Sequence, residues 1–111
     1  MAGFMVMQVW RENARYARDS EGGEGYYPDS MIAACAEAYT IEEGAPSRAL
    51  WFAQYTAPGY MDRTDPVYGN TAREAIEECF RLYGDDEDPA ERSEYASMLW
   101  EARKLDSRKG A

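Results

Sequence analysis

Apolar and polar residues recur along the chain with two different periods, which predicts a mixture of strands and helices. Ala49–Tyr55 (ALWFAQY) has the clearest strand pattern, with Leu50, Phe52 and Gln54 on one side and Trp51, Ala53 and Tyr55 on the other. Phe4–Val9 has a similar pattern and is its natural partner, because a lone strand cannot satisfy its backbone hydrogen bonds. A short segment around Val67–Tyr68 can add a third strand. The pattern therefore predicts a small antiparallel sheet.

The residues after the first strand are compatible with two structures. We expect the strand to end at about Trp10 and a short helix to form over Glu12–Arg18 (ENARYAR). The alternative is one helix from Phe4 through Arg18, but its apolar side would carry two arginines. A strand followed by a short helix is therefore the preferred interpretation.

The next third of the chain predicts a loop and then a helix. Ser20–Pro28 (SEGGEGYYP) contains three glycines and a proline, which disfavour regular structure. We expect Asp29 or Ser30 to cap a helix over Met31–Tyr39, because their side-chain oxygens can accept a free amide of the first turn. Four residues at helical spacing would form its inner face: Met31, Ala34, Cys35 and Ala38.

The clearest helix pattern covers Thr71–Tyr83. Thr71 and Glu74 form a T-x-x-E capping box, Gly84 is expected to end the helix as a C′ residue, and Glu77 can pair with Arg81 at i,i+4. The apolar stripe of this helix consists of Ala72, Ala75, Ile76, Cys79, Phe80 and Tyr83.

The last helix is predicted over Pro89–Leu105. Asp88 is its expected cap, with Pro89 at the first helical position and Glu91 closing a second capping box. We expect a frayed tail over Asp106–Ala111. The inner stripe of the helix consists of Tyr95, Met98, Leu99, Ala102 and Leu105, with Trp100 beside it. The predicted fold class is α+β: one domain in which two or three antiparallel strands are covered by about three helices.

The charge balance makes some partners more plausible than others. Twenty-one acidic and twelve basic residues give the 111-residue chain a net charge of −9. Phosphate backbones repel such a chain, so we expect no direct binding to nucleic acid and favour a protein with a basic surface. Solubility alone is the simpler explanation of the same charge. No membrane-spanning stretch or signal peptide is recognised, so the expected location is the cytoplasm, that of a host cell if a phage encodes the chain.

The residue types argue against several chemistries. The chain has no histidine and two cysteines, Cys35 and Cys79, so nucleophilic catalysis with a histidine base and a structural zinc site are both disfavoured. Both cysteines are expected on apolar helix faces, as reduced core residues. Asp85–Asp88 offers hard oxygen ligands without the spacing of a calcium loop, and it is also a typical solvated helix start. We therefore predict no catalytic residue, metal or cofactor.

The loop between the second strand and the Thr71–Tyr83 helix is the part that folding explains least. Thr56–Asn70 (TAPGYMDRTDPVYGN) is long for a small domain, and long loops with several turn signals are often functional. Arg63 between two aspartates can form an internal ion-pair clamp or recognise a partner. Two further tyrosines, Tyr26 and Tyr27, are expected in the earlier loop. The candidate partner-binding residues of the long loop are Tyr60, Asp62, Arg63, Asp65 and Tyr68.

The segment APGYMDRTD, preceded by an aromatic strand and followed by a TAREA helix, resembles small uncharacterised phage and prophage proteins. The likeness covers Trp51–Tyr83 and carries over no catalytic residue. It implies a small accessory protein of a phage or mobile element. Proteins of that kind often bind and block a host or defence protein.

Three classes of function remain open from the sequence. The first is a non-enzymatic protein-binding module, plausibly a phage-type, anti-CRISPR-like inhibitor with an acidic, tyrosine-rich surface that mimics nucleic acid. The second is a homo-oligomeric structural or accessory phage protein, with Trp10, Trp51 and Trp100 at a subunit contact. The third is a ligand-binding or enzymatic domain that uses the loop of Asp62, Arg63 and Asp65. The acidic candidates for partner binding are Glu74, Glu77, Glu78, Asp85, Asp86 and Glu87.

Overall fold

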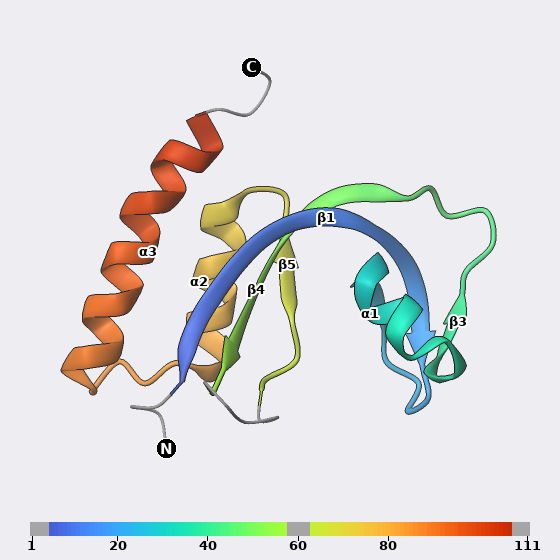
Figure 1. Ribbon diagram of the computed structural model, residues 1–111, viewed down its shortest axis with the longest axis horizontal. Helices are drawn as coiled ribbons and strands as arrows, with labels where there is room; N and C mark the ends of the chain where they lie inside the picture. Colours follow the sequence, from blue (N-terminus) through green and yellow to red (C-terminus); the bar gives the residue numbers. More distant parts are fainter. Residues whose placement is uncertain (1–4, 58–62, 108–111) are drawn as a thin grey trace. The chain divides into compact units, whose positions relative to one another are not determined.

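The structure, a computed structural model, describes residues 5–57 and 63–107. These residues form a five-stranded antiparallel sheet and three α-helices (Figure 1), which confirms the α+β class and gives the sheet more strands than expected. A short 3-10 helix, η2, follows the first α-helix. The elements in order are β1 (Val6–Asp19), β2 (Glu24–Pro28), α1 (Asp29–Ala34), η2 (Ala36–Ala38), β3 (Tyr39–Ile41), β4 (Arg48–Thr56), β5 (Val67–Gly69), α2 (Ala72–Tyr83) and α3 (Pro89–Ser107).

The strand order is β2-β1-β4-β5, and β3 also pairs with β1. The pairing of the first strand with β4, and of β4 with β5, confirms the three strands that the sequence predicts. The chain divides into two compact units, one formed by Met1–Trp10 with Trp51–Ala111 and the other by Arg11–Leu50. That the chain forms one domain stays a prediction.

Strand β1 is longer than predicted, and the helix expected over Glu12–Arg18 is wrong. All of these residues belong to the 14-residue strand β1. Ala17 lies between Gly25 of β2 and Ile41 of β3 in the strand register, and its side chain is buried. Backbone pairing on both edges of β1 outweighs the local helix preference of the segment.

A hairpin replaces the second half of the predicted loop. Glu24–Pro28, including Tyr26 and Tyr27, forms β2 and pairs with β1, so the assignment of both tyrosines to a loop is wrong. The Asp19 carboxylate accepts the amides of Glu21 (2.9 Å) and Gly23 (2.8 Å) and the Tyr27 hydroxyl (3.0 Å). Gly23 donates the strongest of the hydrogen bonds that lower the pKa of Asp19.

The predicted Met31–Tyr39 helix is too long, and its predicted cap is wrong. Helix α1 ends at Ala34, and its N-cap residue is Pro28, which makes no side-chain cap bond. The Glu12 carboxylate from β1 instead accepts the amide of Ser30 in the first turn (2.9 Å). Tyr39 instead begins β3, where it pairs with Asp19 and packs on the Tyr27 ring at 4.8 Å between centroids. The expected inner face is also wrong, because none of its residues is buried and Cys35 is exposed: Met31, Ala34, Cys35 and Ala38.

The core of the unit that contains Trp51–Ala111 lies between the sheet and two helices. In Figure 1, α3 lies beside α2, and α2 runs along β5, in agreement with their contacts. Strand β4 is covered on both faces, with Phe52 and Ala53 fully buried on opposite sides. Alanines bring the layers close together, since only a methyl group separates the backbones. The buried cluster consists of Met7, Ala53, Tyr55, Ala72, Ala75, Ile76, Cys79 and Ala102.

The free amides at the start of α2 are bonded to three different side chains. As predicted, the Thr71 hydroxyl accepts the Glu74 amide (3.1 Å), but the Glu74 carboxylate bonds to the amide of Asn70 (2.8 Å) rather than that of Thr71. Asp106, from the end of α3, accepts the amides of Ala72 (2.8 Å) and Arg73 (3.2 Å). Asp106 and Ser107, where the frayed tail was expected to begin, belong to α3, and residues 108–111 lie outside the described residues.

We expect the substitution Asp106→Ala to destabilise the protein, because it leaves two first-turn amides of α2 without an acceptor and detaches the end of α3. Loss of a helix cap costs about 1–2 kcal/mol of unfolding free energy, which chemical denaturation can measure. Glu101→Ala is the matched control, because this exposed acid on the same helix has only a 3.9 Å ion pair with Lys104. Equal effects of the two substitutions would contradict the capping role.

Candidate protein-binding surface

The last turn of α2 exposes two large apolar side chains. Leu82 is 47% exposed and Tyr83 is 42% exposed, so the assignment of Tyr83 to the buried stripe is wrong. The buried positions of α2 end at Cys79, and Phe80 is only partly covered. The apolar stripe of the helix therefore extends beyond the core that it helps to form.

Gly84 ends the helix for a steric reason. Its amide donates to the Phe80 carbonyl at 2.8 Å, and a Cβ atom at this position would collide with the Phe80 ring. Its φ of −81° is accessible to any residue, so Gly84 is the C-cap residue and not the left-handed C′ residue predicted. The close approach to Phe80 directs the chain immediately into the acidic segment.

The acidic segment Asp85–Asp88 is an ordered turn held by carboxylates. The Asp85 side chain accepts the Glu87 amide (2.9 Å), and the Asp88 side chain accepts the Ala90 amide (2.9 Å), which confirms Asp88 as the cap of α3. Glu91 does not close the predicted capping box with Asp88; its Oε1 accepts the amide of Asp85 at 2.8 Å. Glu91 thereby fixes the start of the acidic segment.

Glu91 and Tyr55 are unusual members of the interior. Glu91 is 5% exposed and Tyr55 is 2% exposed, yet Glu91 Oε2 and the Tyr55 hydroxyl have no hydrogen-bond partner within the described part of the chain. Leaving a buried polar atom unpaired costs stability. Burial, with Cys79, Glu91 and Glu94 nearby, raises the pKa of Tyr55 above its ordinary value of 10.0. The interior at this point favours uncharged groups.

The long loop contributes one carboxylate to the same end of the molecule. Asp65 is exposed, and its charge adds to burial in raising the pKa of Tyr83, so the carboxylate lies within electrostatic range of that tyrosine. Arg63 is exposed and forms an isolated bridge with Thr56, and no ion pair between Arg63 and Asp65 is found. Two other predicted site residues lie outside the described residues: Tyr60 and Asp62.

Residues around Thr64 attach the end of the loop to β4. The Thr64 amide donates to the Tyr55 carbonyl (3.0 Å), its hydroxyl accepts the Tyr55 amide (3.1 Å), and its carbonyl accepts the Gln54 side-chain amide (2.8 Å). Tyr68 belongs to β5 and not to the loop, and its ring lies 6.4 Å from that of Phe52. Tyr68 is 43% exposed, so packing uses about half of its surface.

The acidic residues predicted on α2 have local partners. Glu77 pairs with Arg73 at 3.0 Å and Glu78 with Arg81 at 2.7 Å, so the expected Glu77–Arg81 pair is replaced. The hydrogen bond from Arg81 lowers the pKa of Glu78. Together with Glu74, which bonds to the Asn70 amide, these side chains are less available to a partner than the acids beyond the helix.

These observations define a candidate site, here called the α2-end surface. It contains two apolar side chains, Leu82 and Tyr83, with carboxylates around them: Asp65, Asp85, Asp86 and Glu87. Aromatic and aliphatic groups surrounded by charge are typical of protein interfaces. Sequence reasoning missed Leu82, Tyr83 and the anchoring role of Glu91. The available signal was an apolar stripe that continues to the last residue before Gly84.

The three tryptophans occupy different environments. Trp10 stacks on Phe52 with 5.7 Å between ring centroids, and Trp51 is partly buried against the core. Trp100 is 57% exposed, with the Arg103 guanidinium 5.1 Å from its ring centroid. Of the three, Trp100 is therefore the one that a second chain can reach most readily.

Two further properties concern the described ranges 5–57 and 63–107. No group of three or more Asp, Glu, His or Cys side chains in these ranges is arranged to hold a metal ion. No helix in the same ranges has both the length and the apolar character needed to cross a membrane.

Comparison of the chain with known protein families, curated proteins and solved structures found no match.

The two cysteines should differ in reactivity. Cys79 is buried, and burial raises the pKa of its thiol to about 12, whereas Cys35 is exposed. Because the thiolate is the reactive form, we expect DTNB at pH 8 to label Cys35 in the folded protein and Cys79 only after unfolding. Cys35→Ser should remove the native-state reaction. Rapid labelling of both thiols in the folded wild-type protein would contradict the burial of Cys79.

We expect Tyr55→Phe to preserve or increase stability by about 1 kcal/mol, because it removes a buried hydroxyl that has no partner. The raised pKa values of Tyr55 and Cys79 mean that the folded state binds these protons more tightly. The contribution of these two groups to stability should therefore be constant from neutral pH to about pH 9 and should be lost as the pH rises toward 12. Tyr55→Phe should reduce this alkaline loss, measured by urea denaturation from pH 7 to 11. A clear loss of stability at pH 7 would show that the hydroxyl has a structural role.

Proposed function

We propose that the protein is a non-enzymatic protein-binding module that uses the α2-end surface. The observation that carries the proposal is the exposure of Leu82 and Tyr83 at the end of an otherwise buried helix stripe, beside an ordered run of carboxylates. Buried aromatic and apolar side chains supply most of the binding energy in interfaces. The surrounding carboxylates select a basic partner and exclude acidic ones.

The partner that fits this surface is a protein with an apolar recess bordered by arginine or lysine. The net charge of −9 adds a long-range attraction to such a protein. With the resemblance of Trp51–Tyr83 to phage and prophage proteins, this supports a phage-type inhibitor of a host or defence protein, acting in the host cytoplasm.

Mimicry of nucleic acid is a narrower form of the same proposal. Its supporting feature is the run of carboxylates at Asp85–Glu87 with Asp65 close to Tyr83. Glu77 and Glu78 are less suited, because each has an arginine beside it. A mimic should compete with DNA or RNA for its partner, and its binding should weaken steeply with salt.

The proposal is tested with a partner captured from bacterial lysate, identified, purified and used for affinity measurements. The paired substitution Leu82→Ser with Tyr83→Ala should weaken binding at least about tenfold, as expected when interface anchors are removed. Asp86→Asn with Glu87→Gln should mainly slow association and reduce its salt dependence.

Trp100→Ala is the matched control, because it removes an exposed aromatic residue from another helix. Unchanged affinity of the Leu82/Tyr83 variant, with binding lost on Trp100→Ala, would overturn the proposal. If Trp100→Ala instead converts an oligomer into a monomer in solution, the homo-oligomeric alternative is favoured. Circular dichroism and thermal unfolding show whether each variant is folded.

A further inference from the structure

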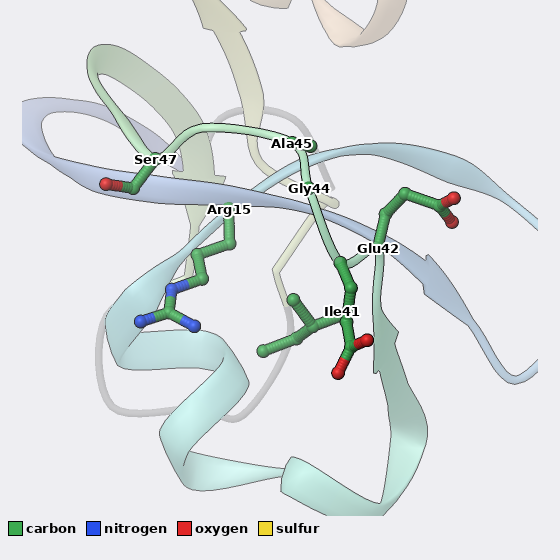
Figure 2. Close-up of a pocket in the computed structure, with 7 residues that line it drawn as sticks. Arg15, Ile41, Glu42, Gly44, Ala45 and Ser47 are labelled. Atoms are coloured by element: carbon green, nitrogen blue, oxygen red, sulfur yellow. The ribbon is translucent and has the colours of Figure 1, made fainter.

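A hollow of about 530 Å³ lies within the Arg11–Leu50 unit, between Arg15 of β1 and the segment that leads from β3 to β4 (Figure 2). Its size falls within the range of about 300–1,000 Å³ that is usual for small-molecule sites. It is lined by Arg15, Ile41, Glu42, Glu43, Gly44, Ala45 and Ser47. None of these residues belongs to the α2-end surface.

The hollow forms where the chain, after pairing with β1 as strand β3, leaves that strand before β4 begins. Ile41 pairs with Ala17, and the Glu42 amide donates to the Tyr16 carbonyl at 3.0 Å. The chain then turns away at Gly44, whose φ of 92° favours glycine, before β4 begins. Arg15 shares a face of β1 with Ala17, and Figure 2 shows Arg15 and Ile41 extending to the same side of the segment.

Within the described ranges, the charged side chains of the hollow have no partner. No hydrogen bond or ion pair of the Arg15 guanidinium, or of the Glu42 and Glu43 carboxylates, is found among the described residues. Arg18, three residues further along the same strand, pairs with Glu24 at 3.8 Å. An unpaired guanidinium in an acidic chain presents a planar fork that fits a carboxylate.

We propose that this hollow binds a zwitterionic ligand of the basic amino-acid class, either free or at the C-terminus of a peptide. Arg15 binds its carboxylate, Glu43 attracts its cationic side chain, and Ile41, which is 36% exposed, contacts the aliphatic part. The Glu43 carboxylate also repels phosphate-rich ligands. The proposal rests on a different unit from the α2-end surface and does not depend on it.

Titration of the ¹⁵N-labelled protein with L-arginine, followed by NMR, tests the proposal. Saturable amide shifts should appear at Glu42–Ser47 and near Arg15. Agmatine, which lacks the carboxylate, should bind about tenfold more weakly, because it loses a charge-assisted hydrogen bond. N-acetyl-Gly-Gly-Arg, which lacks a free α-ammonium group, distinguishes a free amino acid from a peptide C-terminus as the ligand. Binding as tight as that of L-arginine indicates a peptide C-terminus, and much weaker binding indicates the free amino acid.

Arg15→Gln should remove the preference for L-arginine over agmatine, and Glu43→Gln should weaken the binding of both ligands. Arg18→Gln is the matched control, because it removes an equal charge that is paired and lies on the other face of β1. A dispersed amide spectrum shows that each variant is folded. The absence of shifts at Glu42–Ser47 at 10 mM L-arginine, or equal binding by Arg15→Gln and wild type, would overturn the proposal.

Discussion

The sheet depends on the hydrogen bonding of one long strand. Strand β1 pairs with β2, β3 and β4, so three of the other four strands obtain backbone partners from it. Buried backbone groups must be bonded, and this requirement keeps Val6–Asp19 extended although its middle contains good helix formers. Two alanines of β1, Ala14 and Ala17, are buried at positions paired with neighbouring strands. The hairpin turn at Asp19 follows from the pairing of β1 with β2, and the hollow beside Arg15 follows from its pairing with β3.

Elements with complete local signals could be predicted from the sequence, whereas those set by distant contacts could not. Strand β4 and helices α2 and α3 carry periodic apolar faces or caps within their own residues. The helix predicted over Glu12–Arg18 failed because its partners, β2 and β3, lie far along the chain. The missed hairpin had a local signal, Gly22-Gly23 between tyrosine-containing segments, but the glycines were interpreted as loop formers. Tyr39 belongs to a strand and not to the predicted helix, because it pairs with Asp19 of β1.

The sequence predicts the acidic residues of the candidate site but not its exposed apolar residues, Leu82 and Tyr83. The acidic run Asp85–Glu87 and Asp65 are evident in the sequence, and the structure places Asp65 near Tyr83. Whether Tyr83 is buried depends on where the core ends, which a periodic pattern cannot give. The role of Glu91 could not be predicted either. Its bond to the Asp85 amide replaces the capping box with Asp88, which the sequence favours equally well. Cap motifs identify which residues can bond, and the packing of α2 on α3 decides which amide each one reaches.

The acidity of the chain has a structural explanation beside solubility and partner binding. Many carboxylates accept backbone amides at turns, strand starts and helix starts: Glu12, Asp19, Glu74, Asp85, Asp88, Glu91, Glu94 and Asp106. Net charge therefore overstates the acidity available for recognition. Asp65, Asp86 and Glu87 are exposed and accept no backbone amide among the described residues. The fold does not use these three acids to bind backbone amides, and two exposed apolar residues, Leu82 and Tyr83, adjoin them. This end of α2 is therefore a better candidate for partner recognition than the charge of the whole chain.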